Sequence, residues 1–105
     1  MELVTAIYQS TETWPKEEIY GLTSQVRRAA VSVPASIAEG YGRDTRGSYQ
    51  QFLRIAQGSL KEVETHLLIA ERLGFIESAK MGPIMAMSES VGKLLRLLIR
   101  KLSET

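Results

Sequence analysis

One long amphipathic stripe constrains the fold more than any other feature of the sequence. Between residues 46 and 73, apolar side chains recur at every third or fourth position, the spacing that puts them on one face of an α-helix. They are Tyr49, Phe52, Leu53, Ala56, Leu60, Val63, Leu67 and Ala70. At 1.5 Å per residue such a helix is about 40 Å long. It needs long helical neighbours to cover that face, so the sequence predicts an all-α fold.

Capping and helix-ending residues mark the ends of this helix. Asp44, Thr45 or Ser48 can cap its first turn, and Gly74 can end it. Gly58 lies inside it, where glycine costs about 1 kcal/mol relative to alanine. We expect a close helix crossing at Gly58 to offset that cost.

A second helix is expected from Thr23 or Ser24 to Gly40-Tyr41-Gly42. Its buried face is rich in small residues, which allow helices to approach closely. The face comprises Val26, Ala29, Ala30, Val33, Ile37 and Ala38. Pro34 lies inside this helix and lacks an amide hydrogen, so we predict a kink there and not a break.

Two further helices complete the pattern. The first covers about residues 2–12 and stops before Trp14-Pro15, with one more turn expected at 16–20. The last runs from Ser78 or Pro83 to Leu102. Its expected core stripe is Ile84, Met87, Val91, Leu94, Leu95, Leu98 and Leu102, whereas Met85, Leu97 and Ile99 fall on a second face.

Four helices with short connections predict a single domain, an up-down-up-down antiparallel four-helix bundle. Its first helix, only about 16 Å long, cannot cover the full length of its neighbours. The uncovered length and the second apolar face around Met85, Leu97 and Ile99 both indicate a surface buried by a further copy of the chain. We therefore expect a homo-oligomer, although scattered exposed leucines are also normal on monomers.

Composition excludes several classes of protein. The 105 residues contain no cysteine, which rules out disulfides and thiolate chemistry and suits a reducing cytoplasm. Neither a signal peptide nor a membrane-spanning segment is evident, so we expect a cytoplasmic protein. The net charge is +1, but it is uneven along the chain. Residues 1–26 carry −3, residues 27–61 carry +4, and residues 62–105 balance.

The basic middle third supplies the candidate anion or nucleic-acid contacts, which are Arg27, Arg28, Arg43, Arg46, Arg54 and Lys61. Residues 40–48 join two of these arginines to three glycines at the start of a helix. Free amides and a helix dipole can hold an anion there. The stretch lacks the Gly-Lys-Ser/Thr ending of a P-loop, and a plain helix-to-helix connection is the simpler explanation of its glycines.

Catalytic chemistry has little support. His66 is the only histidine, and we expect it to be half exposed on the surface of its helix. Glu62 and His66 are spaced for two metal ligands, but no third ligand is evident. No serine has a credible partner for a triad, and acidic pairs are better read as salt bridges. We expect no enzyme activity, no metal ion and no cofactor.

Residues 20–43, with the run Arg27-Arg28-Ala29-Ala30 and the run Ala38-Glu39-Gly40-Tyr41-Gly42, resemble the signature of a bacterial four-helix bundle family. That family includes proteins encoded in intervening sequences of 23S ribosomal RNA genes. The likeness continues through residues 49–65 and 73–76. Family members usually carry a longer first helix. The motif positions that the resemblance marks as structural are Ser32, Pro34, Glu39, Gly40, Gly42, Glu62 and Glu64.

The resemblance implies a homopentameric ring without known enzymatic activity. A related branch, the accessory variability proteins of diversity-generating retroelements, forms basic pentamers that bind a reverse transcriptase and nucleic acid. This chain is nearly neutral, whereas binding to phosphates needs positive surface. Two functions stay open: an oligomeric RNA or ribonucleoprotein accessory protein, and a protein interaction scaffold without a nucleic-acid role.

Overall fold

A computed structural model describes residues 1–104 of the chain. Four α-helices follow one another: α1 (Glu2–Thr11), α2 (Leu22–Tyr41), α3 (Arg46–Arg72) and α4 (Ser78–Ser103). A single 3-10 turn, η1 (Lys16–Glu18), lies between α1 and α2. The four-helix architecture expected from the sequence is confirmed, and the observed bounds lie within about two residues of the expected ones.

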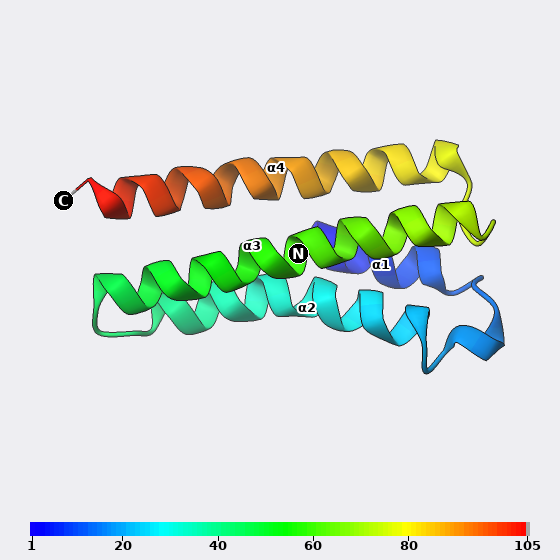
Figure 1. The fold of residues 1–105 in the computed structure, drawn as a ribbon, viewed down its shortest axis with the longest axis horizontal. Helices are drawn as coiled ribbons and strands as arrows, with labels where there is room; N and C mark the ends of the chain where they lie inside the picture. The colour runs from blue at the N-terminus through cyan, green and yellow to red at the C-terminus, as the bar shows by residue number, and fades with distance from the viewer. Residues whose placement is uncertain (105) are drawn as a thin grey trace.

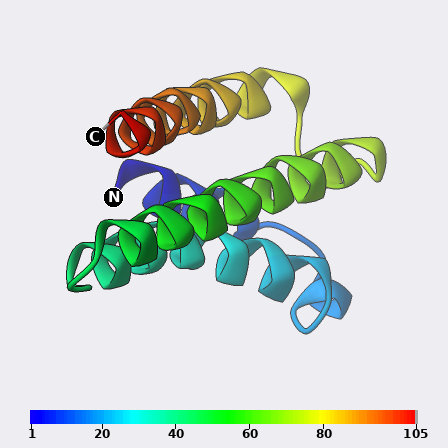
Figure 2. The ribbon, with the colours of Figure 1, turned by 60° about the vertical axis from the view of Figure 1, so that its left-hand side comes forward.

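The helices run antiparallel along a molecule of 47 × 24 × 18 Å (Figure 1). α2 packs most extensively on α3, and α3 also packs on α4, while α1 contacts α2 and α4. Since α1 is the shortest helix, it lies over only one half of the bundle and leaves the half near the α2–α3 loop uncovered (Figures 1 and 2). The length mismatch expected from the sequence is therefore real.

The core follows the predicted stripes closely on α2 and α3. The largest fully buried side chains are Leu3, Ile7, Val26, Val33, Leu53, Val63, Leu67, Ser88 and Leu95. α2 continues as one helix through Pro34. It lies close to α3 near their connecting loop and diverges from α3 toward its N-terminus (Figures 1 and 2). Ala38 was expected in the core but is exposed.

Side-chain hydrogen bonds fix the starts of α2 and α3. Thr45 caps α3 by accepting a hydrogen bond from the Ser48 amide at 3.1 Å. α2 begins at Leu22, one or two residues before the expected caps, because Glu18 in the preceding turn accepts the Leu22 amide at 3.1 Å. Gly74 ends α3 with φ +78°, a left-handed conformation that favours glycine.

Glycines 40 and 58 play opposite roles on the α2 and α3 helices. A Cβ added to Gly40 would lie 2.7 Å from Phe52 Cβ, so glycine lets α2 and α3 approach closely there. A Cβ added to Gly58 would meet nothing within 4 Å. The close crossing expected at Gly58 is therefore wrong, and the crossing lies at Gly40, one helix earlier.

The short α1 helix is held by a half-buried arginine of α2. Arg27 of α2 donates from Nε to Thr11 Oγ1 at 2.8 Å, and its guanidinium lies 4.8 Å from the ring centre of Tyr8. The Thr11 hydroxyl in turn donates a hydrogen bond to the carbonyl of Ile7 or Tyr8. Arg27 thus contacts a hydroxyl and an aromatic ring of α1.

α4 carries the exposed apolar surface. Leu94 was expected in the core but is 53% exposed, and Leu97, three residues later, is 40% exposed. Met85 and Ile99 instead pack, half buried, against the core. The two faces expected on α4 are thus redistributed, because α1 is too short to cover Leu94. No described helix is long and apolar enough to cross a membrane.

Candidate nucleic-acid interface

One end of the bundle carries more cations than acids. The α2–α3 loop and the C-terminal end of α4 both lie there (Figure 1). A hydrogen bond from Gln50 Nε2 to the Ile99 carbonyl, 3.1 Å long, joins α3 to α4 at this end. Segments that are about 50 residues apart in the chain therefore share one surface, which we call the basic end and define as residues 35–56 and 96–104.

The basic end has a formal charge of +3, from six cations and three acids. The cations are Arg43, Arg46, Arg54, Arg96, Arg100 and Lys101, and the acids are Glu39, Asp44 and Glu104. The rest of the chain carries seven cations and nine acids, a net of −2. A nearly neutral chain thus folds into a bundle whose charge is separated along its long axis.

Three of the six predicted contact residues lie in the basic end. Arg46 is exposed at the first position of α3, and Arg54 is exposed eight residues later in the same helix. Arg43 pairs with Glu39 at 3.4 Å and lies 4.9 Å from the ring centre of Phe52, so part of its charge is already compensated. Within residues 1–104, no ion pair joins Arg46 or Arg54 to an acid.

The other three predicted contacts lie outside the basic end. Arg27 is half buried and holds α1, so it is not free for a phosphate. Lys61 pairs with Glu64 at 3.2 Å. Arg28 is exposed on α2, beside a polar hollow of about 360 Å³ between α2 and α3. The structure therefore brings together only half of the predicted set.

Sequence reasoning missed Arg96, Arg100 and Lys101, all exposed on α4. Residues 62–105 balance to zero, which hid their charge. Within that stretch the acids precede residue 90 with one exception, and four of the six cations follow it. Counting the charges of each half of α4 separately, and placing α4 antiparallel to α3, would have predicted the basic end.

The motif positions marked by the resemblance have mainly structural contacts. Ser32 and Ser59 share a hydrogen bond of 2.8 Å between α2 and α3. Glu64 accepts a hydrogen bond from buried Ser88 of α4. Glu39 pairs with Arg43, Gly42 caps α2, and Pro34 is half buried inside α2.

Glu62 and His66 face the polar hollow between α2 and α3, together with Arg28, Ser32 and Ser59. His66 is half exposed, as expected, although its Nδ1 atom is buried and has no hydrogen-bond partner in the described chain. Among residues 1–104, no three metal-binding side chains gather. The Ser59 hydroxyl lies against Ser32, and no hydrogen bond joins it to the imidazole.

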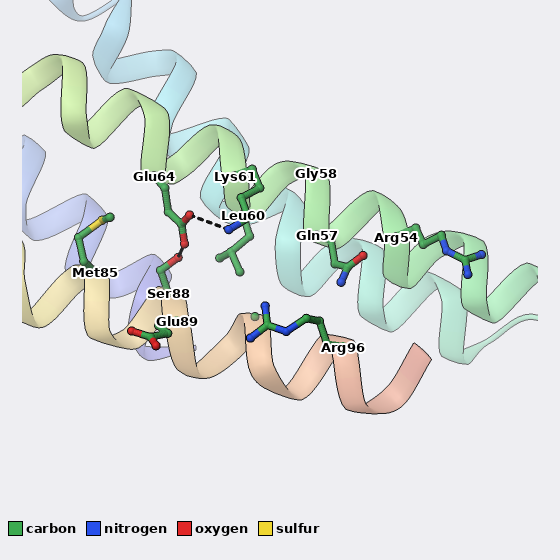
Figure 3. A pocket seen from close by; sticks show the side chains of 11 residues that line it. Arg54, Gln57, Gly58, Leu60, Lys61, Glu64, Met85, Ser88, Glu89 and Arg96 are labelled. Atoms are coloured by element: carbon green, nitrogen blue, oxygen red, sulfur yellow. Dashed lines mark hydrogen bonds and ion pairs between the residues drawn. The ribbon is translucent and has the colours of Figure 1, made fainter. Parts of the chain in front are cut away.

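A larger groove lies between α3 and α4. It encloses about 630 Å³ and is bordered on the α3 side by Arg54, Gln57 and Lys61 (Figure 3). Arg96 of α4 extends beside the opposite wall. This groove opens next to the basic end and shares two of its arginines.

Comparison with known families decides the relationship that the motifs suggest. The sequence profile of the 23S rRNA-intervening sequence protein family matches residues 1–97. This chain belongs to that family. A comparison with curated proteins gives no match. Membership in the 23S rRNA-intervening sequence protein family is thus established. The basic end and the α3–α4 groove are the features of this member that suggest a function.

Proposed function

We propose that this member of the 23S rRNA-intervening sequence protein family is a non-enzymatic homo-oligomer that binds RNA through its basic end. The observation that carries the proposal is the charge separation along the bundle. Six cations gather around one end with only three acids, although the whole chain is nearly neutral. The family name, which refers to ribosomal RNA, agrees with an RNA ligand.

Phosphate binding requires exposed cations that are not already paired with acids, since a paired cation gives up one interaction to gain another. Arg46, Arg54 and Arg100 meet that requirement in the described chain. Arg46 also lies at the N-terminus of α3, where the helix dipole favours negative charge. Assembly into a ring would repeat these cations in every copy, which raises the local positive charge well above that of one chain.

The test is binding of a fluorescent RNA hairpin of about 20 base pairs at several salt concentrations. If three phosphates are contacted, affinity should fall about 20- to 40-fold between about 50 and 200 mM salt. The double variants R43A/R46A and R100A/K101A should each weaken binding and flatten its salt dependence. A control double variant, K16A/K80A, removes two exposed cations from outside the basic end and should bind like the wild type.

RNA binding that is absent at low salt, or that responds equally to the control variant, would rule out the basic end as an RNA interface. Wild-type binding that does not weaken with salt would do the same, because it would not involve phosphates. The comparison needs no knowledge of the natural RNA sequence, since contacts to phosphates are independent of sequence.

Self-association is the second part of the proposal, and the exposed leucines of α4 support it. Leu94 and Leu97 lie three residues apart on the surface that α1 does not cover, next to half-buried Leu98. Burying such a patch against another copy removes apolar surface from water. Light scattering should give a multiple of the 11.7 kDa chain mass, with five copies as the number implied by the resemblance.

L94E/L97E should lower the mass toward 11.7 kDa while keeping the helical circular dichroism. A wild-type mass equal to one chain would contradict the assembly. The same exposed leucines favour the alternative function, a protein interaction scaffold without RNA. That alternative predicts an oligomer that has no salt-sensitive affinity for RNA, so the two functions are distinguished by the hairpin experiment.

A further inference from the structure

The α3–α4 groove is a cavity lined by side chains of both helices. Its volume of about 630 Å³ falls within the range of about 300–1,000 Å³ typical of small-molecule pockets. Two hydrogen bonds join its walls: Ser88 donates to Glu64 within the groove, and Gln50 donates to the Ile99 carbonyl nearer the α2–α3 loop. Figure 3 shows the side chains that line the groove, with Ser88 of α4 next to Glu64 of α3.

Two glycines keep the groove open. Gly58 of α3 has nothing within 4 Å of a built Cβ, and Gly92 of α4 has only Arg96 Nη1 and Leu60 Cδ2 nearby, at 3.3 and 3.4 Å. Leu60 is buried and forms the floor, and Met85 supplies a flexible apolar wall. The centre of the groove is therefore apolar and suits the body of an organic molecule.

The charges in the groove favour an anion. Glu64 is largely buried, with 19% of its side chain exposed, and Ser88 and Lys61 both donate to it. Glu89 pairs with Lys93 on α4 at 3.8 Å. Arg54 and Arg96 also line the groove, and in the described chain neither makes an ion pair with an acid. Both acids that line the groove thus have partners already, whereas its two arginines have no ion pair within residues 1–104.

We propose that the α3–α4 groove binds a small organic anion with an apolar body, such as an aryl phosphate monoester. The body lies on Leu60 and Met85, and the phosphate accepts hydrogen bonds from Arg96, whose guanidinium lies beside Leu60 (Figure 3). Arg54 adds positive charge farther along α3. Guanidinium donors match phosphate oxygens in geometry and charge. The site shares Arg54 and Arg96 with the basic end, but it takes a single small ligand and does not require RNA.

The test uses 1-naphthyl phosphate, titrated by calorimetry and by NMR shifts of Leu60 and Met85 methyl groups. We expect saturable binding with a Kd of about 1 mM or tighter, in line with the efficiency of drug-sized ligands. Inorganic phosphate carries only the charge and 1-naphthol only the ring, so each should bind at least about ten-fold more weakly. R96A should weaken naphthyl phosphate binding by about ten-fold, and R54A by less, because only Arg96 lies beside Leu60.

R100A is the matched control, because Arg100 is an exposed arginine one turn beyond Arg96 and does not line the groove. It should leave the affinity within about two-fold of the wild type. R43A/R46A, which weakens RNA binding in the proposal above, should also leave the naphthyl phosphate affinity unchanged. The two proposals can therefore fail separately.

A second variant tests the cavity without removing charge. G58F places a ring at the groove rim, where no neighbour opposes a side chain, so folding should be preserved. It should abolish naphthyl phosphate binding while the thermal midpoint stays at or above that of the wild type. No saturable binding to the wild type, unchanged affinity in R96A or G58F, or an R100A effect as large as that of R96A would each overturn the proposal.

Discussion

Gly40 of α2 lies so close to Phe52 of α3 that a methyl group on Gly40 would sit 2.7 Å from Phe52 Cβ. Tyr49 crowds the same point, with its ring at 3.0 Å and its carbonyl oxygen at 3.3 Å. The near neighbours are a β-carbon, a ring and a backbone atom, none of which can swing aside like the end of a long side chain. This contact sets the separation of α2 and α3 beside the basic end.

Substitution G40A should therefore destabilise the protein. Alanine favours the helix over glycine by about 1 kcal/mol, but overpacking a close helix contact costs about 1–3 kcal/mol. At such a short distance we expect the clash to win, with a net loss of about 1–2 kcal/mol. Urea unfolding followed by circular dichroism measures the change; an equal or higher midpoint would mean that the helices separate freely.

The opposite result is expected at Gly58. Its position is open, so G58A adds no clash and removes the entropic cost of glycine inside a helix. The free energy of unfolding should rise by about 1 kcal/mol. The same urea experiment serves both variants, and a loss of stability in G58A would show that something packs against this position.

Neighbouring arginines on α2 should differ sharply in their contribution to stability. R27A removes the hydrogen bond to Thr11 and the contact with the Tyr8 ring, so we expect a loss of about 1–3 kcal/mol. R28A changes an exposed residue and should stay within about 0.5 kcal/mol of the wild type. Hydrogen exchange adds a local readout: amides of α1 should lose protection in R27A alone, and equal protection in both variants would contradict the anchoring role.

The bridge between α3 and α4 makes a further prediction. Ser88 is fully buried and donates to Glu64, so S88A leaves a carboxylate with one donor fewer in a largely buried place. We expect a loss of about 1–3 kcal/mol. S90A, two residues along the same helix, changes an exposed serine and is the control. Thermal melts of the pair should separate, and coincident melts would mean that the bridge contributes nothing.

Helical spacing predicted most of the fold because apolar periodicity reports directly on the buried face. It worked on α3, where every residue of the expected stripe is buried or half buried. It failed at Leu94, since the spacing of a residue says which face it occupies but not whether a neighbouring helix is long enough to cover that face. It also failed at Gly58, because a glycine in a helix has the same local cost whether or not another helix approaches.

The candidate site was harder to predict than the fold. Arg43, Arg46 and Arg54 are close in the sequence and could be found as a basic stretch. Arg96 and Arg100 joined them only because α4 returns along α3. Arg27 was misplaced for a different reason, since nothing local distinguishes an arginine that holds α1 from its exposed neighbour Arg28. The α3–α4 groove depends on two glycines 34 positions apart, a pairing that only the tertiary structure reveals.

Trp14, the only tryptophan, is 5% exposed and lies with its ring centre 6.0 Å from that of Phe75, where the connection after α1 meets the loop before α4. The chain consequently carries its own optical reporter of one end. Tryptophan emission will register the loosening of that end, whereas RNA added at the basic end should leave the emission nearly unchanged. Tyr41 and Tyr49 pack edge to face at the far end, beside the α2–α3 loop. Emission from Trp14 can thus follow one end of this small bundle without any label.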